Sequence, residues 1–129
     1  MKMEVNMTII EAINRIDLIK PNHYAQTDKI KWLSDFDGRI KSEIIDTHVG
    51  GEGIVFEGYN EFTPHDTKLL ASGQYDDLYI KWLESQIDYT NGEYQSYNNS
   101  VTAFNNIYSS FERYYNRHYM PKTQKLKFF

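Results

Sequence analysis

Cysteine is absent from this chain of 129 residues. The chain can therefore form no disulfide, no thiolate metal site and no cysteine nucleophile, and it suits a reducing compartment such as the cytoplasm. Long apolar runs are missing as well. No stretch approaches the roughly 20 apolar residues that span a membrane, and the first residues lack the apolar segment of a signal peptide. At this length we expect a single domain, 1–129, folded around one hydrophobic core.

Proline and glycine are scarce, with three prolines and seven glycines, and their positions divide the chain. Pro21 and Pro121 each follow a segment of helical periodicity and mark its end, because proline cannot continue a helix. Four of the glycines fall between positions 50 and 58, where they make a helix unfavourable. We therefore expect helical regions on both sides of a glycine-rich loop.

Apolar residues recur at spacings of three and four in four segments, which is typical of amphipathic helices. Thr8 and Glu11 form a capping-box pattern at the start of the first helix, and Asp37 falls on the apolar side of the second. The predicted fold class is mostly α: a four-helix domain with a glycine-rich loop between helices two and three and an extended C-terminal tail. The helices are expected over 8–20, 27–48, 75–96 and 99–119, with residues 1–7 as an N-terminal arm.

The third helix contains an Asn91-Gly92 pair, which would be a hairpin turn between two strands. Its flanking residues have helical periodicity, so we predict one long helix that passes through the pair to about Ser96. Tyr97-Asn98-Asn99 is then a tight connection, and Asn99 or Ser100 caps the fourth helix. A connection this short makes the two helices antiparallel neighbours.

Residues 49–74 are expected to form a projecting loop. The run Ile54-Val55-Phe56 within it is β-prone and can form half of a short β-hairpin. Loops of this length in compact domains are usually functional or mobile. The alternative is a surface loop that packs Phe56 and Phe62 back onto its own domain. The loop residues that we expect at a protein interface are Gly51, Ile54, Phe56 and Tyr59.

The tail, residues 121–129, contains three lysines and no acid. Leucine and phenylalanine alternate there with lysine, and a period of two after a helix end predicts an extended strand. Such a strand can add to the sheet edge of a neighbouring subunit, and the alternative is a disordered basic tail. The terminal aromatic pair favours docking. The expected contact residues are Lys122, Lys125, Leu126, Lys127, Phe128 and Phe129.

The net charge and the tyrosine content of the chain both indicate what kind of partner it can bind. The net charge is −4, and because the tail carries +3, the rest of the chain carries −7. An acidic body argues against wrapping around DNA phosphates, although DNA can still pass nearby. The chain also holds 11 tyrosines. Tyrosine combines an apolar ring with a hydroxyl group and is common at protein interfaces that are partly solvated, so the tyrosines can indicate a partner. Alternatively, they lie at the edge of an ordinary hydrophobic core, with their hydroxyl groups in solvent.

No catalytic or metal-binding motif is present in the sequence. The four histidines, at positions 23, 48, 65 and 118, have no ligand spacing on one helix face. The Gly50–Gly53 stretch is not followed by the Lys-Ser/Thr of a phosphate-binding loop. The carboxylates are expected mostly on polar, solvated helix faces, where nothing separates two pKa values as acid–base catalysis requires. They are Asp35, Asp37, Glu43, Asp46, Glu84 and Asp88. We therefore expect no enzyme, no cofactor and no metal site.

The chain resembles a known protein family over nearly its whole length. The matching positions are residues expected to pack in the fold, and they do not form a catalytic motif. The matching stretches are Ile9–Ile13, Lys31–Ser34, Asp46–His48, Phe56–Tyr59, Asp77–Glu84, Gln86–Tyr89, Tyr97–Ser100, Tyr114–Arg117 and Met120–Lys122. In these stretches the chain resembles the head–tail connector proteins (adaptor or head-completion proteins) of Firmicutes phages and prophages.

The resemblance implies a non-enzymatic virion protein that needs no cofactor. Such subunits form a homo-oligomeric ring, usually twelvefold, dock on the portal protein and carry the next neck protein, a stopper or tail-completion protein. DNA would pass through the ring without sequence-specific binding, and no membrane would take part. The protein would lie in the virion neck after assembly in the host cytoplasm.

Two other functions stay open. The acidic body permits a small phage-encoded regulatory binding module that acts on a host protein, which would be absent from purified virions. A metal-dependent hydrolase with scattered histidine and aspartate ligands would contain stoichiometric metal, so elemental analysis decides that case.

Overall fold

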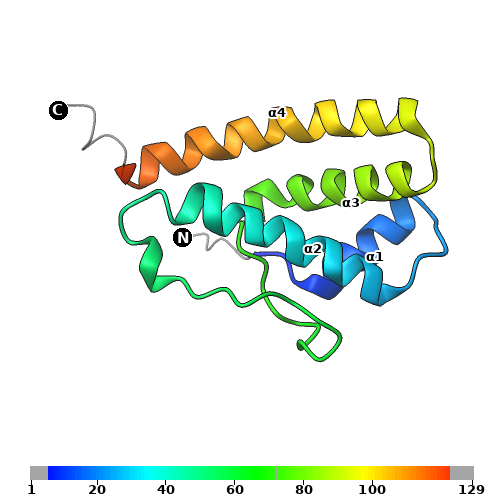
Figure 1. Ribbon diagram of the computed structural model, residues 1–129, viewed down its shortest axis with the longest axis horizontal. Helices are drawn as coiled ribbons and strands as arrows, with labels where there is room; N and C mark the ends of the chain where they lie inside the picture. Colours follow the sequence, from blue (N-terminus) through cyan, green and yellow to red (C-terminus); the bar gives the residue numbers. More distant parts are fainter. Residues whose placement is uncertain (1–5, 72, 123–129) are drawn as a thin grey trace.

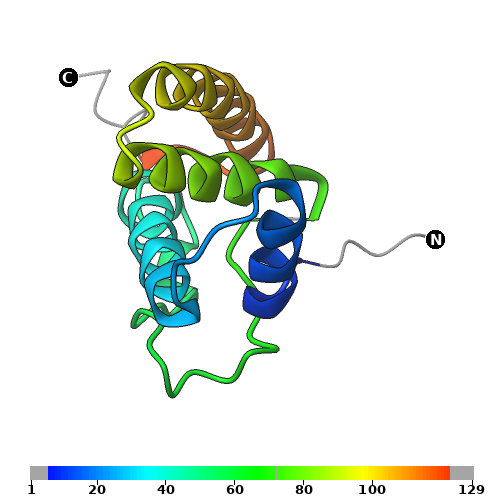
Figure 2. The same ribbon diagram turned by 90° about the vertical axis from the view of Figure 1, so that its right-hand side faces the viewer.

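The structure, a computed structural model, describes residues 6–71 and 73–122. Its four α-helices confirm the predicted mostly α class. They form three layers: α3 lies between α4 on one side and the pair α1 and α2 on the other (Figures 1 and 2). The bounds are α1 (Ile9–Ile19), α2 (Gln26–Ile40), α3 (Asp76–Thr90) and α4 (Tyr94–His118).

The hydrophobic core is built around α3 because this helix has neighbours on both sides. Its Tyr79 and Leu83 are fully buried. Phe36 of α2 stacks on Trp82 with 5.3 Å between ring centroids and meets Phe104 of α4 edge-on at 5.2 Å. Ring pairs at these separations add about 1 kcal/mol to the burial of apolar area. Many aromatic residues of α3 and α4 therefore fill the core.

The first helix starts as predicted. Thr8 Oγ1 accepts a hydrogen bond from Glu11 N at 3.2 Å, and Glu11 Oε1 accepts one from Thr8 N at 2.9 Å. The hydrogen bonds from Thr8 lower the pKa of Glu11 below its usual value. The capping box satisfies two backbone donors that the helix itself leaves without partners.

The second helical segment, expected over 27–48, is helical from Gln26 to Ile45 in two kinds of turn. After α2 the chain continues in a π-helical turn, η1 (Lys41–Ile45). The wider turn lets the consecutive residues Ile44 and Ile45 both lie in the core. The helix also continues through Gly38, whose missing Cβ would stand 3.7 Å from Phe56 Cε2, an ordinary contact distance.

The predicted third helix is too long, and the predicted position of the connection is wrong. The helix α3 ends at Thr90, and α4 already begins at Tyr94. Gly92 has φ +77°, a left-handed conformation that glycine adopts without strain, so the Asn-Gly pair does form a turn. Ser100, expected as a cap, is buried inside α4. The helices are antiparallel neighbours, as expected (Figure 1).

Between α2 and α3 the chain runs below α1 and α2 as a long irregular segment with short 3-10 turns at Gly51–Gly53 and Gly73–Tyr75. The predicted β-hairpin is wrong: within residues 6–71 and 73–122 the only β pairing is two isolated bridges, Thr8 with Lys68 and His48 with Pro121. Ile54 to Phe56 lacks a partner strand. A two-stranded hairpin is marginal in water without further strands to support it.

Candidate functional site

The end of α4 meets the segment before the glycine-rich loop at one corner of the molecule. Lys122 N donates to Thr47 O at 2.8 Å, and Val49 N donates to Met120 O at 2.8 Å. These two hydrogen bonds flank the antiparallel bridge between His48 and Pro121. The chain therefore leaves α4 in an extended conformation, held against residues 47–49.

A buried histidine fixes this corner. His48 Nδ1 lies 2.5 Å from Ile44 O, and Nε2 lies 2.7 Å from Asn116 Oδ1. The imidazole ring meets Tyr115 edge-on with 4.8 Å between centroids. Both ring nitrogens are thus engaged by the protein itself. The residue joins the end of η1 to the last turns of α4, which is an anchoring role.

Three of the interface residues predicted from the sequence come together at this corner. Gly51 is buried, and its N–H donates to His48 O at 3.2 Å. Ile54 is exposed at the rim, and Lys122 pairs with Glu52 at 3.6 Å. Predicted contact residues Lys125, Leu126, Lys127, Phe128 and Phe129 lie outside the described residues.

The other two predicted interface residues point inward. Phe56 and Tyr59 meet edge-on at 5.0 Å and are partly buried, so this part of the loop packs back onto its own domain. Tyr59 N donates to Ser34 Oγ at 2.9 Å. Phe62, at the tip, is 85% exposed and does not pack back. The loop therefore packs on its own domain at Phe56 and Tyr59, while Val55 and Phe62 are exposed.

Aliphatic and aromatic side chains, together with Asn6, line a hollow of about 220 Å³ at the same corner. Its lining residues include Ile45, Ile54, Leu70, Phe111 and Tyr115. Further large apolar side chains are exposed around this end of α4 and the start of the loop, namely Val49, Val55, Tyr119 and Met120. Exposed apolar groups that gather in one place indicate a contact surface. We call the segments 47–56 and 119–122 the tail corner.

A buried carboxyl group ties the loop to the helices. Asp37 accepts hydrogen bonds from Tyr59 Oη at 2.5 Å, Tyr79 Oη at 2.7 Å and Leu70 N at 3.1 Å. Tyr79 Oη in turn accepts from Ala71 N at 2.7 Å. Two distant parts of the long segment between α2 and α3 thus meet at one side chain of α2.

Burial raises the pKa of Asp37 to about 6, and the hydrogen bonds from Tyr59, Tyr79 and Leu70 oppose that rise. The pKa of Tyr79 is also raised, first by burial and then by the negative charge of Asp37. The carboxyl group is fully buried and its oxygens are occupied by protein donors. The cluster therefore has the geometry of a structural anchor rather than of an open acid–base site.

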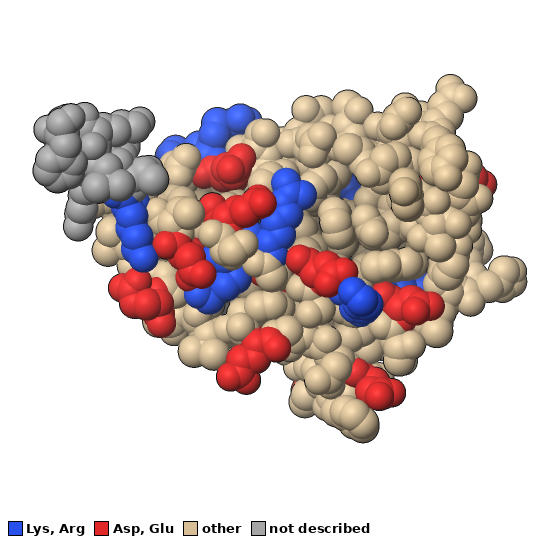
Figure 3. Space-filling model, in the orientation of Figure 1, with Lys and Arg blue, Asp and Glu red and all other residues tan. Residues whose placement is uncertain are grey.

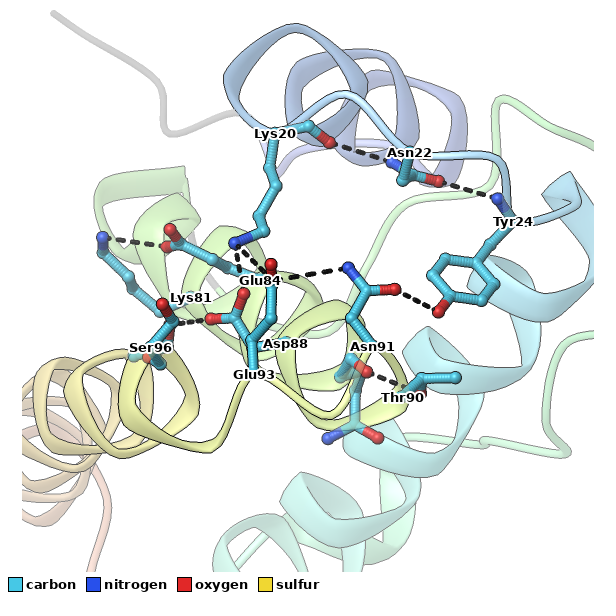
Figure 4. Close-up of polar contacts among 12 residues, drawn as sticks. Lys20, Asn22, Tyr24, Lys81, Glu84, Asp88, Thr90, Asn91, Glu93 and Ser96 are labelled. Carbon is cyan, nitrogen blue, oxygen red and sulfur yellow. Dashed lines mark hydrogen bonds and ion pairs between the residues drawn. The ribbon is translucent and has the colours of Figure 1, made fainter.

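A second buried carboxyl group, that of Asp88 near the end of α3, connects the end of α1 with α4 (Figure 4). Asp88 forms an ion pair with Lys20, which follows α1, and accepts a hydrogen bond from Ser100 Oγ at 2.7 Å. Hydrogen bonding to Asp88 raises the pKa of Lys20. Glu93 lies 3.5 Å from the same lysine. These contacts hold three helices at one end of the molecule.

The hollow beside this ion pair, of about 230 Å³, contains charges that neutralise one another. Lys81 pairs with Glu84 at 3.1 Å, and Lys20 is shared by two carboxylates. A ligand of either sign would have to compete with these pairs. The arrangement supports cohesion of the helices better than recognition of a charged small molecule.

The sequence pointed to Asp37 without revealing its role. An acid that recurs with Ile30, Leu33 and Ile40 on one helix face is a signal of a buried carboxyl group, since that face has to enter the core. The expectation that Asp37 and Asp88 belong with the carboxylates of polar helix faces is wrong, since both side chains are buried. The sequence does not identify the tyrosines and the lysine that supply their partners.

Searches for other kinds of site gave negative results within the described part of the chain. Residues 6–71 and 73–122 contain no group of three or more histidine, aspartate or glutamate side chains that could hold a metal ion. No helix among them is long and apolar enough to cross a membrane. In comparisons with known proteins, no family model, no curated protein and no solved structure matches the chain.

Proposed function

We propose that this chain is a virion assembly subunit of the head–tail connector type, which forms a ring below the portal and links the capsid to the tail. The observation that carries the proposal is the tail corner. There, Tyr119 to Pro121 run extended beside the exposed Val49, and Lys122, where a 3-10 turn begins, is hydrogen-bonded to Thr47.

The single β-bridge at this corner cannot be extended along its own molecule. Residues 120–122 pair antiparallel with residues 47–49, so an extension of the ladder would have to run along residues 46 and below. Those residues are already helical from Lys41 to Ile45. Their backbone groups are used inside the helix and cannot pair with a strand. A docking strand beyond Lys122 would therefore find its partner edge on a neighbouring molecule.

The surface charge gives little support to the alternative, a regulatory module that offers an acidic face to a host protein. Acidic and basic side chains are interspersed over the left and middle of the face shown in Figure 3. The structure also contains local ion pairs, such as Arg39 with Glu43 at 3.0 Å and Lys31 with Asp35 at 3.2 Å. A face of mixed sign does not present the continuous negative charge that a nucleic-acid mimic needs.

The test compares the full chain with a chain that ends at Lys122. The shortened chain retains the described contacts of the tail corner, so its helical circular dichroism should equal that of the full chain. We expect the full chain to associate with the portal protein in sedimentation and to give rings in negative-stain images. The shortened chain should lose at least tenfold in portal affinity.

Two outcomes would overturn the proposal. The first is a full chain that does not associate with portal at any salt concentration, and the second is its absence from purified particles by mass spectrometry. Equal binding by both chains would contradict the role of the tail.

A further inference from the structure

The N-terminal part of α4 presents a face without charge. From Tyr94 to Phe111 the sequence contains no acidic, basic or histidine residue, although a quarter of the whole chain is charged. The upper right of Figure 3, over this part of α4, is correspondingly almost free of charged side chains. Between positions 94 and 111 of α4 the exposed residues are Tyr94, Gln95, Ser96, Asn98, Asn99, Thr102, Asn105, Asn106 and Ser109.

Four asparagines dominate this face and do little for the fold. Asn98, Asn99, Asn105 and Asn106 are exposed, and within the described residues their side chains form no hydrogen bond. Asparagine is a poorer helix former than alanine, so its presence in the middle of a helix does not favour the fold. Other asparagines of the chain, such as Asn60 and Asn116, hydrogen-bond through their side chains. The four amides are therefore donors and acceptors that the folded chain leaves for another molecule.

The asparagines are arranged symmetrically about Thr102. Two of them stand three and four residues before Thr102, and the other two stand three and four residues after it. At about 100° per residue, all four lie within roughly 60° of Thr102 around the helix axis. An antiparallel helix with the same sequence, related by a two-fold axis at Thr102, would set Asn98 against Asn106 and Asn99 against Asn105. Gln95 would then face Ser109, and Tyr94 would face Ser110.

This match favours a second copy of the chain as the occupant. An amide donates and accepts hydrogen bonds, so a face of amides is complementary to itself, whereas a face of carboxylates or lysines is not. The chain carries a net charge of −4, so two copies repel each other least where neither presents a charge. At one end of the face, exposed Tyr94 lies against Tyr89 with 5.8 Å between ring centroids and supplies apolar area.

We propose that two copies of this chain associate through antiparallel contact of their α4 helices, with the two-fold axis passing at Thr102. The contact face is about 24 Å long, at a rise of 1.5 Å per residue over 16 residues. With a helix diameter of about 10–12 Å, this face covers roughly 240–290 Å². That area is smaller than the roughly 800 Å² per partner of a typical stable interface, so we expect a weak, reversible dimer. The contact uses a different part of the surface from the tail corner and does not depend on the connector proposal.

Cross-linking tests the axis directly, because the native chain has no cysteine. Helices packed 8–10 Å apart leave about 4–5 Å between the two Cα atoms at the axis, within disulfide reach. Thr102→Cys at 50 μM should form a disulfide-linked dimer at least tenfold faster than Thr27→Cys, an equally exposed threonine of α2. Equal rates for the two variants would overturn the proposed axis.

A charge exchange provides the second test. Asn99→Lys and Asn105→Glu each place an unpaired charge in the contact and should weaken the dimer at least tenfold in sedimentation equilibrium. The double variant sets each lysine against the glutamate of the other copy and should recover most of the affinity. Asn14→Glu, at an exposed asparagine of α1, is the matched control and should have no effect. A wild-type chain that stays monomeric at 500 μM, or a double variant no better than the single ones, would refute the proposal.

Discussion

Asp37 shows how one side chain of the core can organise a segment that has no regular structure. It accepts two tyrosine hydroxyls and one backbone N–H, all from residues that follow it in the sequence by 22 positions or more. A buried carboxyl group is costly unless its oxygens are satisfied, and these three donors satisfy them. The segment from Tyr59 to Ala71 is held on α2 and α3 by this cluster.

The raised pKa of Asp37 predicts an unusual pH dependence. The pKa is about 6 in the folded chain against 3.8 ordinarily, so the folded state binds the proton more tightly than the unfolded state. The contribution of Asp37 to stability is therefore fully present below pH 4 and is lost as the pH rises to 6, by up to about 3 kcal/mol. Asp37→Asn should remove this loss, as urea unfolding at pH 4, 5, 6 and 7 would measure.

Other carboxyl groups titrate in the opposite sense and have to be subtracted. The pKa of Glu11 is lowered by hydrogen bonds from Thr8, and that of Glu43 by hydrogen bonds from Arg39 and Tyr108, so both stabilise the fold as the pH rises. The comparison of wild type with Asp37→Asn cancels these contributions. Parallel stability curves for the two chains between pH 4 and 7 would show that Asp37 does not titrate there.

At the scale of single elements, the 3-10 turn Gly51–Gly53 requires glycine at its first position, Gly51, but not at Gly53. A Cβ on Gly51 would stand 2.1 Å from Ile45 O, a distance that forces the backbone to move. A Cβ on Gly53 would meet nothing within 4 Å, and its φ is not positive. The turn therefore needs a bare Cα at one position because η1 approaches it closely.

Substitution at the two positions should separate their roles. Gly51→Ala should lower the free energy of unfolding by about 2–3 kcal/mol, through overpacking against a backbone carbonyl. Gly53→Ala should change it by less than about 1 kcal/mol, since it adds a methyl group in open space. Thermal unfolding of both variants would measure the difference. Similar losses in the two variants would contradict the close approach of Gly51 to η1.

The elements themselves were predicted well where local patterns decide them. Thr8 and Glu11 located the start of α1, since a capping box depends only on residues three apart. At Asn91-Gly92 two local patterns gave different predictions. The Asn-Gly pair is typical of a turn, whereas the helical spacing of the tyrosines continues through the pair and predicts a helix. The turn formed because Gly92 adopts a left-handed conformation there, and Tyr94 belongs to α4 rather than to α3.

At the scale of the whole molecule, the ion pair of Lys20 and Asp88 connects the outer α1 to the α3–α4 pair. Asp88 is 1% exposed and Lys20 is 26% exposed, so the carboxylate depends on this lysine and on Ser100 for its partners. Removal of one partner from a buried pair leaves a charge without compensation, which costs more than the pair itself contributes. Association of α1 with the other helices thus relies on a polar contact as well as on its isoleucines.

A double-mutant cycle should show this dependence. Lys20→Met should destabilise the chain by about 2 kcal/mol, less than the 3–5 kcal/mol of a fully buried pair because solvent reaches the lysine. Adding Asp88→Asn should recover at least half of the loss, since the asparagine needs no countercharge and can still accept from Ser100. The control Lys31→Met breaks the exposed pair of Lys31 with Asp35 and should cost less than about 1 kcal/mol. Additive losses at positions 20 and 88 would rule out the coupling.

Sequence alone determined the mostly α class, the start of α1 and the position of the long loop, because these depend on periodicity, capping and glycine content within short windows. Only the tertiary structure decided that Asp37 meets Tyr59 and Tyr79, that His48 and Gly51 hold the tail corner together, and that four asparagines share one outer face of α4. These arrangements join residues that lie far apart in the chain or depend on which helix face the core covers. Local patterns carry no information on such long-range packing.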